Sequence, residues 1–374
     1  MTKTRKVVAT GLVTLLASAT LAACGDAPAD ETSTGSDSSS SSEPAVSDFT
    51  PCIVSDAGGF DDKSFNQLGY EGALQAADEL GVELKPVESN SENDFGPNLE
   101  SLVSEGCDVI VTVGFALASA TKESATANPD IEYVLIDDSA DGGDDGATFD
   151  GEADVENIKP LLYNTAQAAF LAGYAAADYT KTGKVGTYGG MPFPTVTIFM
   201  DGFKQGAEYY GKEKGKDIKV VGWDGKNGSF TGGFEANEAA TSTAKQILDQ
   251  DVDVILPVGG PIYQGAITAI EDSGKDIAML GVDADLYETD PATQPYVMTS
   301  ILKGMKVSTY EAVLAAGNDE FDFSPYVGTL ENDGVGIAPF HDFEGKVNPE
   351  LAAELDTIRA GIIDGSIEVT SYLG

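Results

Sequence analysis

The sequence predicts an α/β fold with two similar lobes, each built on a parallel sheet that helices cover on both faces. From Thr50 onward, short β-branched runs alternate with alanine-rich stretches, as in strands joined by helices. Segment 109–114 is also echoed by segment 254–259, since both are apolar runs that end in Val-Gly. The echo indicates a duplicated lobe, unless it is a chance likeness between α/β units.

The β-branched runs and the alanine-rich stretches give each expected element in chain order. The expected strands are 53–55, 82–87, 109–113, 133–136, 184–188, 218–221, 252–257 and 278–282. The expected helices are 65–80, 116–127, 166–179, 196–210, 236–250 and 262–272.

An acid ends one expected strand in each half: Asp137 follows 133–136, and Asp283 follows 278–282. Ligands of open α/β sheets bind beyond the carboxyl ends of the strands. Two facing lobes would therefore place both acids at one cleft.

The charge and composition exclude several classes of function. The 374 residues include 21 Lys and Arg against 62 Asp and Glu, a net charge of −41 that repels nucleic acid. A hydrophobic content of 42% is enough for a sizeable core, and the length suggests about two domains. The single histidine, His341, cannot build a multi-histidine metal site, and no dinucleotide or phosphate-loop motif occurs. We therefore expect no metal, no cofactor and no enzymatic activity.

The N-terminus is typical of an exported, lipid-anchored protein. Residues 1–23 combine a basic start with a short apolar run, and the run ends in Leu-Ala-Ala before Cys24. That ending resembles a lipobox, which predicts lipidation of Cys24; an ordinary signal peptide cut nearby is the alternative. Residues 24–48 are rich in Ser, Asp, Glu and Pro, so we expect a flexible tether.

Two further cysteines would then remain in an oxidising compartment. Cys52 opens the first apolar run and Cys107 precedes the run 109–113. If these runs are neighbouring parallel strands, a disulfide is within reach, because strands lie about 4.8 Å apart. Two buried free thiols are the alternative.

The loop after the first strand, 55–67, is rich in glycine and acid, and Ser64 is placed to cap the following helix. This loop resembles the signature of the basic membrane protein family, the purine-nucleoside-receptor type of ABC transporter substrate-binding lipoproteins. Matching segments continue in the family's order at 113–115, 170–174, 184–191, 202–207, 228–230, 281–285 and 299–303.

The resemblance implies a type I periplasmic-binding-protein fold, with two Rossmann-like lobes joined by a three-strand hinge. It places the first lobe in 49–162 plus 286–322, and the second in 163–285 plus 323–374. Segment 296–302 would then return to the first lobe, so that Asp283 and Lys303 would join the lobes when the cleft closes.

The family's ligand residues carry over onto matching positions. A base would be stacked between Phe65 and Phe230, with Asp56 and Asp137 at its edge, and the ribose would be held by Asp283 and Lys303 with one of two glycines. The full expected set is Asp56, Phe65, Asn66, Phe115, Asp137, Phe230, Gly259, Gly260, Asp283 and Lys303. Ala57 and Pro261 depart from the family's pattern and put the choice of nucleoside in doubt.

The implied function is that of a monomeric binding protein, lipid-anchored on the extracytoplasmic face of the cell membrane, that captures nucleosides for an ABC permease. A sugar or another small polar ligand is the alternative within binding proteins. A nucleoside hydrolase that uses Asp56, Asp61 and Asp62 is the alternative from another class.

Overall fold

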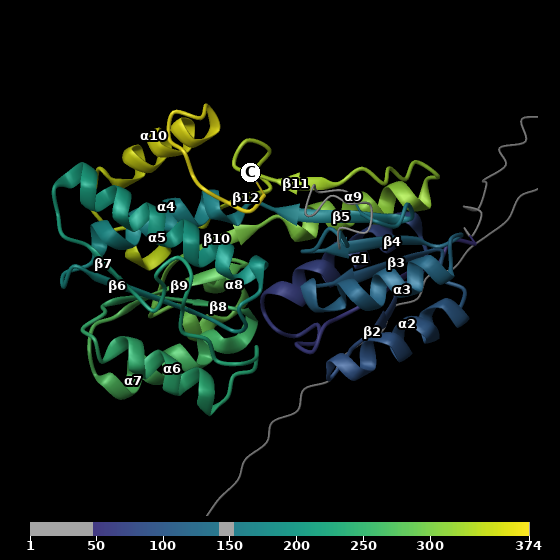
Figure 1. Ribbon diagram of the computed structural model, residues 1–374, viewed down its shortest axis with the longest axis horizontal. Helices are drawn as coiled ribbons and strands as arrows, with labels where there is room; N and C mark the ends of the chain where they lie inside the picture. The colour runs from purple at the N-terminus through teal and green to yellow at the C-terminus, as the bar shows by residue number, and fades with distance from the viewer. Residues whose placement is uncertain (1–47, 142–152, 374) are drawn as a thin grey trace, which may run out of the picture. The chain divides into compact units, whose positions relative to one another are not determined.

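The computed structural model describes residues 48–141 and 153–373, and these ranges form two six-stranded sheets (Figure 1). The predicted leader 1–23, the lipidation site Cys24 and almost all of the tether 24–48 lie outside the described residues. None of the helices in the described ranges is long and apolar enough to cross a membrane.

The first sheet has the strand order β11-β5-β4-β3-β1-β2, and its neighbouring strands are parallel. Alternate side chains of its strands point to opposite faces, so Ile53 joins the core beside α1 while Val54 joins the core beside α2. Helix α1 packs against α9, and α2 packs against α3. The strands are β1 Pro51–Val54, β2 Lys85–Val87, β3 Val109–Val113, β4 Glu132–Ile136, β5 Ile158–Tyr163 and β11 Tyr326–Gly328, and the helices are α1 Phe65–Leu80, α2 Phe95–Ser104, α3 Ala118–Ala127 and α9 Met305–Gly317.

The second sheet has the order β12-β10-β9-β8-β6-β7, in which β12 pairs antiparallel with β10 and the other pairs are parallel. Helix α4 packs against α5, and α6 packs against α7. The two sheets have the same spatial order when the strands of each lobe are numbered along the chain. From one edge to the other, the order is second, first, third, fourth and fifth strand, and the last strand, which comes later in the sequence, lies at the far edge. This shared order confirms the predicted pair of similar lobes. The strands are β6 Lys184–Gly189, β7 Lys219–Val221, β8 Val254–Val258, β9 Ala278–Asp283, β10 Val297–Lys303 and β12 Val335–Ile337, and the helices are α4 Thr165–Tyr179, α5 Pro194–Lys214, α6 Glu238–Leu248, α7 Tyr263–Ser273, α8 Leu286–Thr289 and α10 Leu351–Ile363.

Sheet membership corrects the predicted lobe boundaries at 286 and 323. Strand β10 pairs with β9, so the chain leaves the second lobe only after Lys303, when it enters α9. Strand β11 pairs with β5 of the first sheet, and the chain returns to the second lobe at β12. The physical reason is that 297–303 is a buried apolar strand that extends the second sheet beside β9. The first crossing runs from β5, which ends at Tyr163, to α4, which begins at Thr165.

Cys52 and Cys107 form a disulfide at one end of the first sheet, with their Cα atoms 6.0 Å apart. Both side chains are buried, and they lie side by side because β1 and β3 are parallel neighbours and Cys107 lies two residues before β3. The bond ties the start of β1 to the turn before β3.

Candidate functional site

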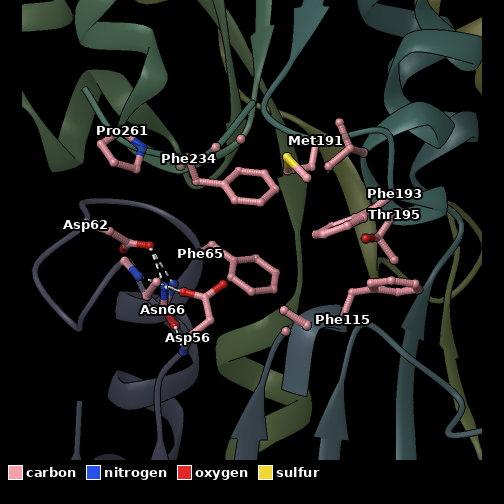
Figure 2. Close-up of a pocket in the computed structure, with 18 of the residues that line it drawn as sticks. Asp56, Asp62, Phe65, Asn66, Phe115, Met191, Phe193, Thr195, Phe234 and Pro261 are labelled. Carbon is pink, nitrogen blue, oxygen red and sulfur yellow. Dashed lines mark hydrogen bonds between the residues drawn. The ribbon is translucent and has the colours of Figure 1, made fainter. Parts of the chain in front are cut away.

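A cavity of about 430 Å³ lies between the carboxyl ends of the two sheets, and both lobes contribute to its wall (Figure 2). The first lobe contributes residues that follow β1, β2, β3 and β4, while the second lobe contributes residues that follow β6, β7 and β8 and the last residues of β9 and β10. This is where open α/β sheets bind ligands. The predicted residues that line the cavity are Asp56, Phe65, Asn66, Phe115, Asp137, Gly259, Gly260, Asp283 and Lys303.

The loop after β1 holds Asp56 in a fixed orientation. Its Oδ1 atom accepts hydrogen bonds from Asn66 Nδ2 at 2.7 Å and from the Gly58 amide at 2.9 Å. Asn66 Oδ1 accepts from the Asp56 amide, and Asn66 Nδ2 also donates to Asp62 (Figure 2). Asn66 therefore lines the cavity, but both ends of its amide are used to position the two acids.

Burial is the main cause that raises the pKa of Asp56 to about 6. The hydrogen bonds from Gly58 and Asn66 lower this pKa, while the nearby charges of Asp62 and Asp137 raise it. Near neutral pH the Asp56 carboxyl group can therefore act as a hydrogen-bond acceptor, and in mild acid it can donate.

Asp62, rather than Ser64, caps helix α1. Its carboxylate accepts hydrogen bonds from the backbone amides of Ser64 at 3.0 Å, Asn66 at 2.8 Å and Gln67 at 3.1 Å. Ser64 makes no side-chain cap hydrogen bond. The expected capping role of Ser64 is wrong because a carboxylate two residues earlier satisfies the free amides of the first turn.

Aromatic rings form one side of the cavity. Figure 2 shows Phe65 on the first-lobe side and Phe234 opposite it on the second-lobe side. Phe193 completes this wall, with its ring centroid 4.8 Å from Phe115 and 5.9 Å from Phe234. Such rings offer flat apolar faces to a planar ligand.

The structure does not place Phe230 in the cavity wall. Its ring stands edge-on to Trp223, with centroids 6.2 Å apart, and rests against Gly189. Phe234 lines the cavity at the position predicted for Phe230. Its ring fits there because Gly190 and Gly259 have no side chains: a Cβ atom would lie 2.4 Å from the ring at Gly190 and 2.7 Å from it at Gly259. The aromatic ring opposite Phe65 is therefore that of Phe234.

Lys303, Asp137 and Asp283 form the polar side of the cavity. Lys303 Nζ donates to Asp137 Oδ2 at 2.8 Å and lies 3.5 Å from Asp283 Oδ1. The three side chains are buried, and the ammonium group also lies 5.1 Å from the centre of the Phe65 ring. Asp283 Oδ1 accepts no hydrogen bond from the described residues.

These contacts correct the predicted link between the lobes. Asp283 and Lys303 lie on neighbouring strands of the second lobe, because Leu302 pairs with Asp283 in the register of β10 and β9. Among these three side chains, the contact that crosses between the lobes is that of Lys303 with Asp137. Asp137 directly follows β4 and Asp283 ends β9, and both have the same left-handed conformation, with φ of 73° and 66°. Such a backbone is unfavourable for aspartate and turns the chain sharply at both strand ends.

The three charges shift one another's pKa. Burial raises the pKa of Asp137 and of Asp283, and the Lys303 ammonium group offsets part of that rise. Burial lowers the pKa of Lys303, but the two carboxylates outweigh burial and hold it above its usual value. Lys303 therefore stays charged, and its carboxylate partners are poised to accept hydrogen bonds.

Sequence reasoning missed the aromatic residues Phe193 and Phe234. Phe193 lies in the loop after β6, the first strand of the second lobe, which is the counterpart of the loop that carries Phe65. The similarity of the two lobes could therefore have indicated Phe193 as a residue of the cavity. Among the described residues, no group of three or more His, Cys, Asp or Glu side chains is arranged to hold a metal ion.

The comparisons with known proteins agree on one family. The family model described as ABC transporter substrate-binding protein PnrA-like matches residues 49–370. Basic membrane protein A of Borreliella burgdorferi is 29% identical over 328 residues, which cover 84% of this chain and 86% of that protein. An uncharacterized lipoprotein of Pyrococcus abyssi is 31% identical over 327 residues, 85% of this chain and 75% of the other. The ABC transporter nucleoside-binding protein BmpA of Lactococcus lactis is 26% identical over 384 residues, 98% and 99% of the two chains.

Solved structures agree on the fold. An ABC transporter solute-binding protein of Aeropyrum pernix superposes with a TM-score of 0.74 at 24% identity, over 86% of this chain and 93% of that one. An arabinose-binding protein of Geobacillus stearothermophilus gives a TM-score of 0.57 at 17% identity, over 80% and 99%. The fold of these neighbours is the type I fold of periplasmic solute-binding proteins.

Proposed function

Because this chain belongs to the PnrA-like family of ABC transporter substrate-binding proteins, we propose that its cavity binds a nucleoside, preferably a purine nucleoside, for transfer to an ABC permease. The observation that carries the proposal is the division of one cavity into an aromatic side and a polar side. A nucleoside has the same division, since its planar base is attached to a sugar rich in hydroxyl groups.

The aromatic side suits the base. Phe65 and Phe234 face the cavity from opposite lobes, so a planar ring between them would be stacked on both faces. Stacking of a base on an aromatic side chain contributes about 1–3 kcal/mol. Asp56 lies beside Phe65 and can pair with the polar edge of the base.

The polar side suits the ribose. Asp283 Oδ1 is a buried carboxylate oxygen that accepts no hydrogen bond from the described residues, and the hydroxyl groups of ribose are donors. Lys303 can donate to a hydroxyl oxygen while it remains paired with Asp137. The Lys303 ammonium group is the nearest donor, 3.5 Å from this oxygen, so a ligand hydroxyl that donates at a shorter distance would stabilise the complex.

The names of relatives support the same ligand class and location. The Lactococcus lactis relative is named a nucleoside-binding protein, and the Pyrococcus abyssi relative is named a lipoprotein. We extend both descriptions to this chain: Cys24 would carry the lipid, and residues 24–48 would tether the binding unit to the outer face of the membrane.

Titration calorimetry of the purified protein tests the ligand class. Adenosine, guanosine, inosine, uridine, cytidine and free ribose would be titrated separately, and at least one purine nucleoside should bind with a Kd well below about 100 μM. Ribose should not compete. Absence of binding by all five nucleosides, or competition by ribose as strong as by any nucleoside, would refute the proposal.

A further inference from the structure

Ser64 belongs to the first lobe, but its hydroxyl group bonds to the second. Ser64 Oγ donates to the backbone carbonyl of Val282 at 3.0 Å, and it lies 3.4 Å from Asp283 Oδ2. The side chain is 1% exposed, so the bond is shielded from water. Val282 and Asp283 end β9 of the second sheet.

Local structure frees this hydroxyl group for a contact between lobes. A serine at the start of a helix ordinarily accepts hydrogen bonds from the first turn. Here the Asp62 carboxylate accepts those bonds, including the one from the Ser64 amide itself. Loss of the Ser64 hydroxyl would therefore leave the start of α1 capped.

The position of Ser64 links both sides of the cavity. It precedes Phe65, which lines the aromatic side, and it contacts Asp283, which lines the polar side, yet it is not part of the cavity wall itself. We propose that Ser64 is a latch between the lobes, a positioning residue that favours the closed arrangement and slows release of ligand without touching it.

The expected size of the effect on closure follows from the free energy that one buried hydrogen bond contributes. Such a bond contributes about 0.5–1.5 kcal/mol, so Ser64→Ala should shift the equilibrium toward the open arrangement by roughly two- to tenfold. The Val282 carbonyl would keep its hydrogen bond from the Ala284 amide at 2.8 Å, so the turn after β9 should stay intact. Lys303 and Asp137 still join the lobes in this variant.

Hydrogen–deuterium exchange tests the latch without any ligand. Ser64→Ala in the full chain should raise exchange about two- to tenfold in segments from both lobes that meet at this contact, 62–68 and 280–288. Ser89→Ala is the matched control, because Ser89 is also buried in the first lobe but its hydroxyl accepts from Asn98 of the same lobe. Unchanged exchange in both segments, or a rise confined to 62–68, would overturn the proposal, since the latter indicates only fraying of α1.

Ligand release provides the second readout, and this part rests on the proposed function. In stopped-flow measurements with guanosine, Ser64→Ala should increase the dissociation rate about two- to tenfold with little change in the association rate, and Ser64→Thr should restore slow release. An unchanged dissociation rate would also overturn the latch. If the parent protein binds no nucleoside, the proposed function fails, and the exchange experiment alone decides on the latch.

Discussion

At the scale of single residues, Phe230 and Phe234 are rival candidates for one role, because both lie in the segment of the second lobe between β7 and α6. Phe234 lines the cavity, whereas Phe230 packs against Trp223. Phe234→Ala should therefore weaken guanosine binding by roughly five- to hundredfold, from the loss of about 1–3 kcal/mol of stacking. Calorimetry would measure this loss.

Phe230→Ala is the natural control for that measurement. It should lower the free energy of unfolding, because the half-buried ring supports Trp223, but it should weaken guanosine binding less than Phe234→Ala does. The reverse order of the two affinities would restore the prediction made from sequence.

The raised pKa of Asp56 predicts a pH dependence of stability. Its pKa is about 6 in the folded protein against an ordinary value of 3.8, so folding favours the protonated carboxyl group. The contribution of Asp56 to the free energy of unfolding is therefore greatest below about pH 4, and it is lost as pH rises to about 6. Asp56→Asn removes this titration and keeps an oxygen that accepts from Asn66.

The variant and the parent protein should be compared by urea unfolding at pH 4 and pH 7. When the pH is raised from 4 to 7, the unfolding free energy of the parent should fall by on the order of 2 kcal/mol relative to that of Asp56→Asn. A difference between the two proteins that does not change with pH would show that Asp56 titrates normally.

At the scale of elements, the sequence indicated those strands and helices whose patterns are local. Helix α1 begins and ends where predicted, and the eight predicted strands are all present, because β-branched runs and alanine-rich stretches determine them. Strand β10 was not among them, although it is buried and central. Its run mixes apolar residues with Thr299, Ser300 and Lys303, and the helix before it, α8, has only four residues, so only the pairing of β10 with β9 reveals its lobe.

The candidate site shows the same limit. The acids and glycines at the strand ends could be predicted, because position after a strand determines where such residues lie. The partner that Lys303 reaches in the first lobe, and the choice of Phe234 over Phe230, depend on side-chain packing between lobes. No pattern within one segment carries that information.

The close packing of α4 against α5 gives a prediction at this scale. A Cβ atom at Gly206 of α5 would lie 1.9 Å from the backbone oxygen of Phe170 in α4, so no side chain fits. Gly206→Ala should lower the free energy of unfolding by about 1–3 kcal/mol or more, although alanine is the better helix former. Gly96→Ala in α2 is the control, because a Cβ atom there meets no atom within 4 Å beyond its chain neighbours. Gly96 precedes Pro97, whose ring disfavours helical backbone at a residue with a Cβ atom, so the gain from alanine is offset and the free energy of unfolding should change by less than about 1 kcal/mol. Thermal unfolding should show a clearly larger loss for Gly206→Ala, and equal losses would contradict the packing argument.

At the scale of the whole molecule, the buried cation Lys303 joins the charges of the two lobes. Lys303 of the second lobe pairs with Asp137 of the first and lies beside Asp283 of its own lobe. Lys303→Met would leave two buried carboxylates without a cation, and breaking a buried ion pair in this way costs about 3–5 kcal/mol. We expect a loss of unfolding free energy of that order at pH 7, measured by urea unfolding.

The pH dependence distinguishes this loss from a simple packing defect. The pKa values of Asp137 and Asp283 are already raised by burial, and removal of Lys303, which lowers them, should raise both further. A group whose pKa is raised on folding stabilises the folded state in acid, so the deficit of Lys303→Met should shrink as the pH falls through the raised pKa values of the two carboxyl groups. Lys306→Met is the matched control, because Lys306 forms an ion pair of the same 2.8 Å length with Glu71, and both of these side chains are partly exposed to solvent. That control should change the free energy of unfolding by less than about 1 kcal/mol. A deficit of Lys303→Met that equals that of Lys306→Met, or that does not vary with pH, would show that the buried cation does not hold the lobes together.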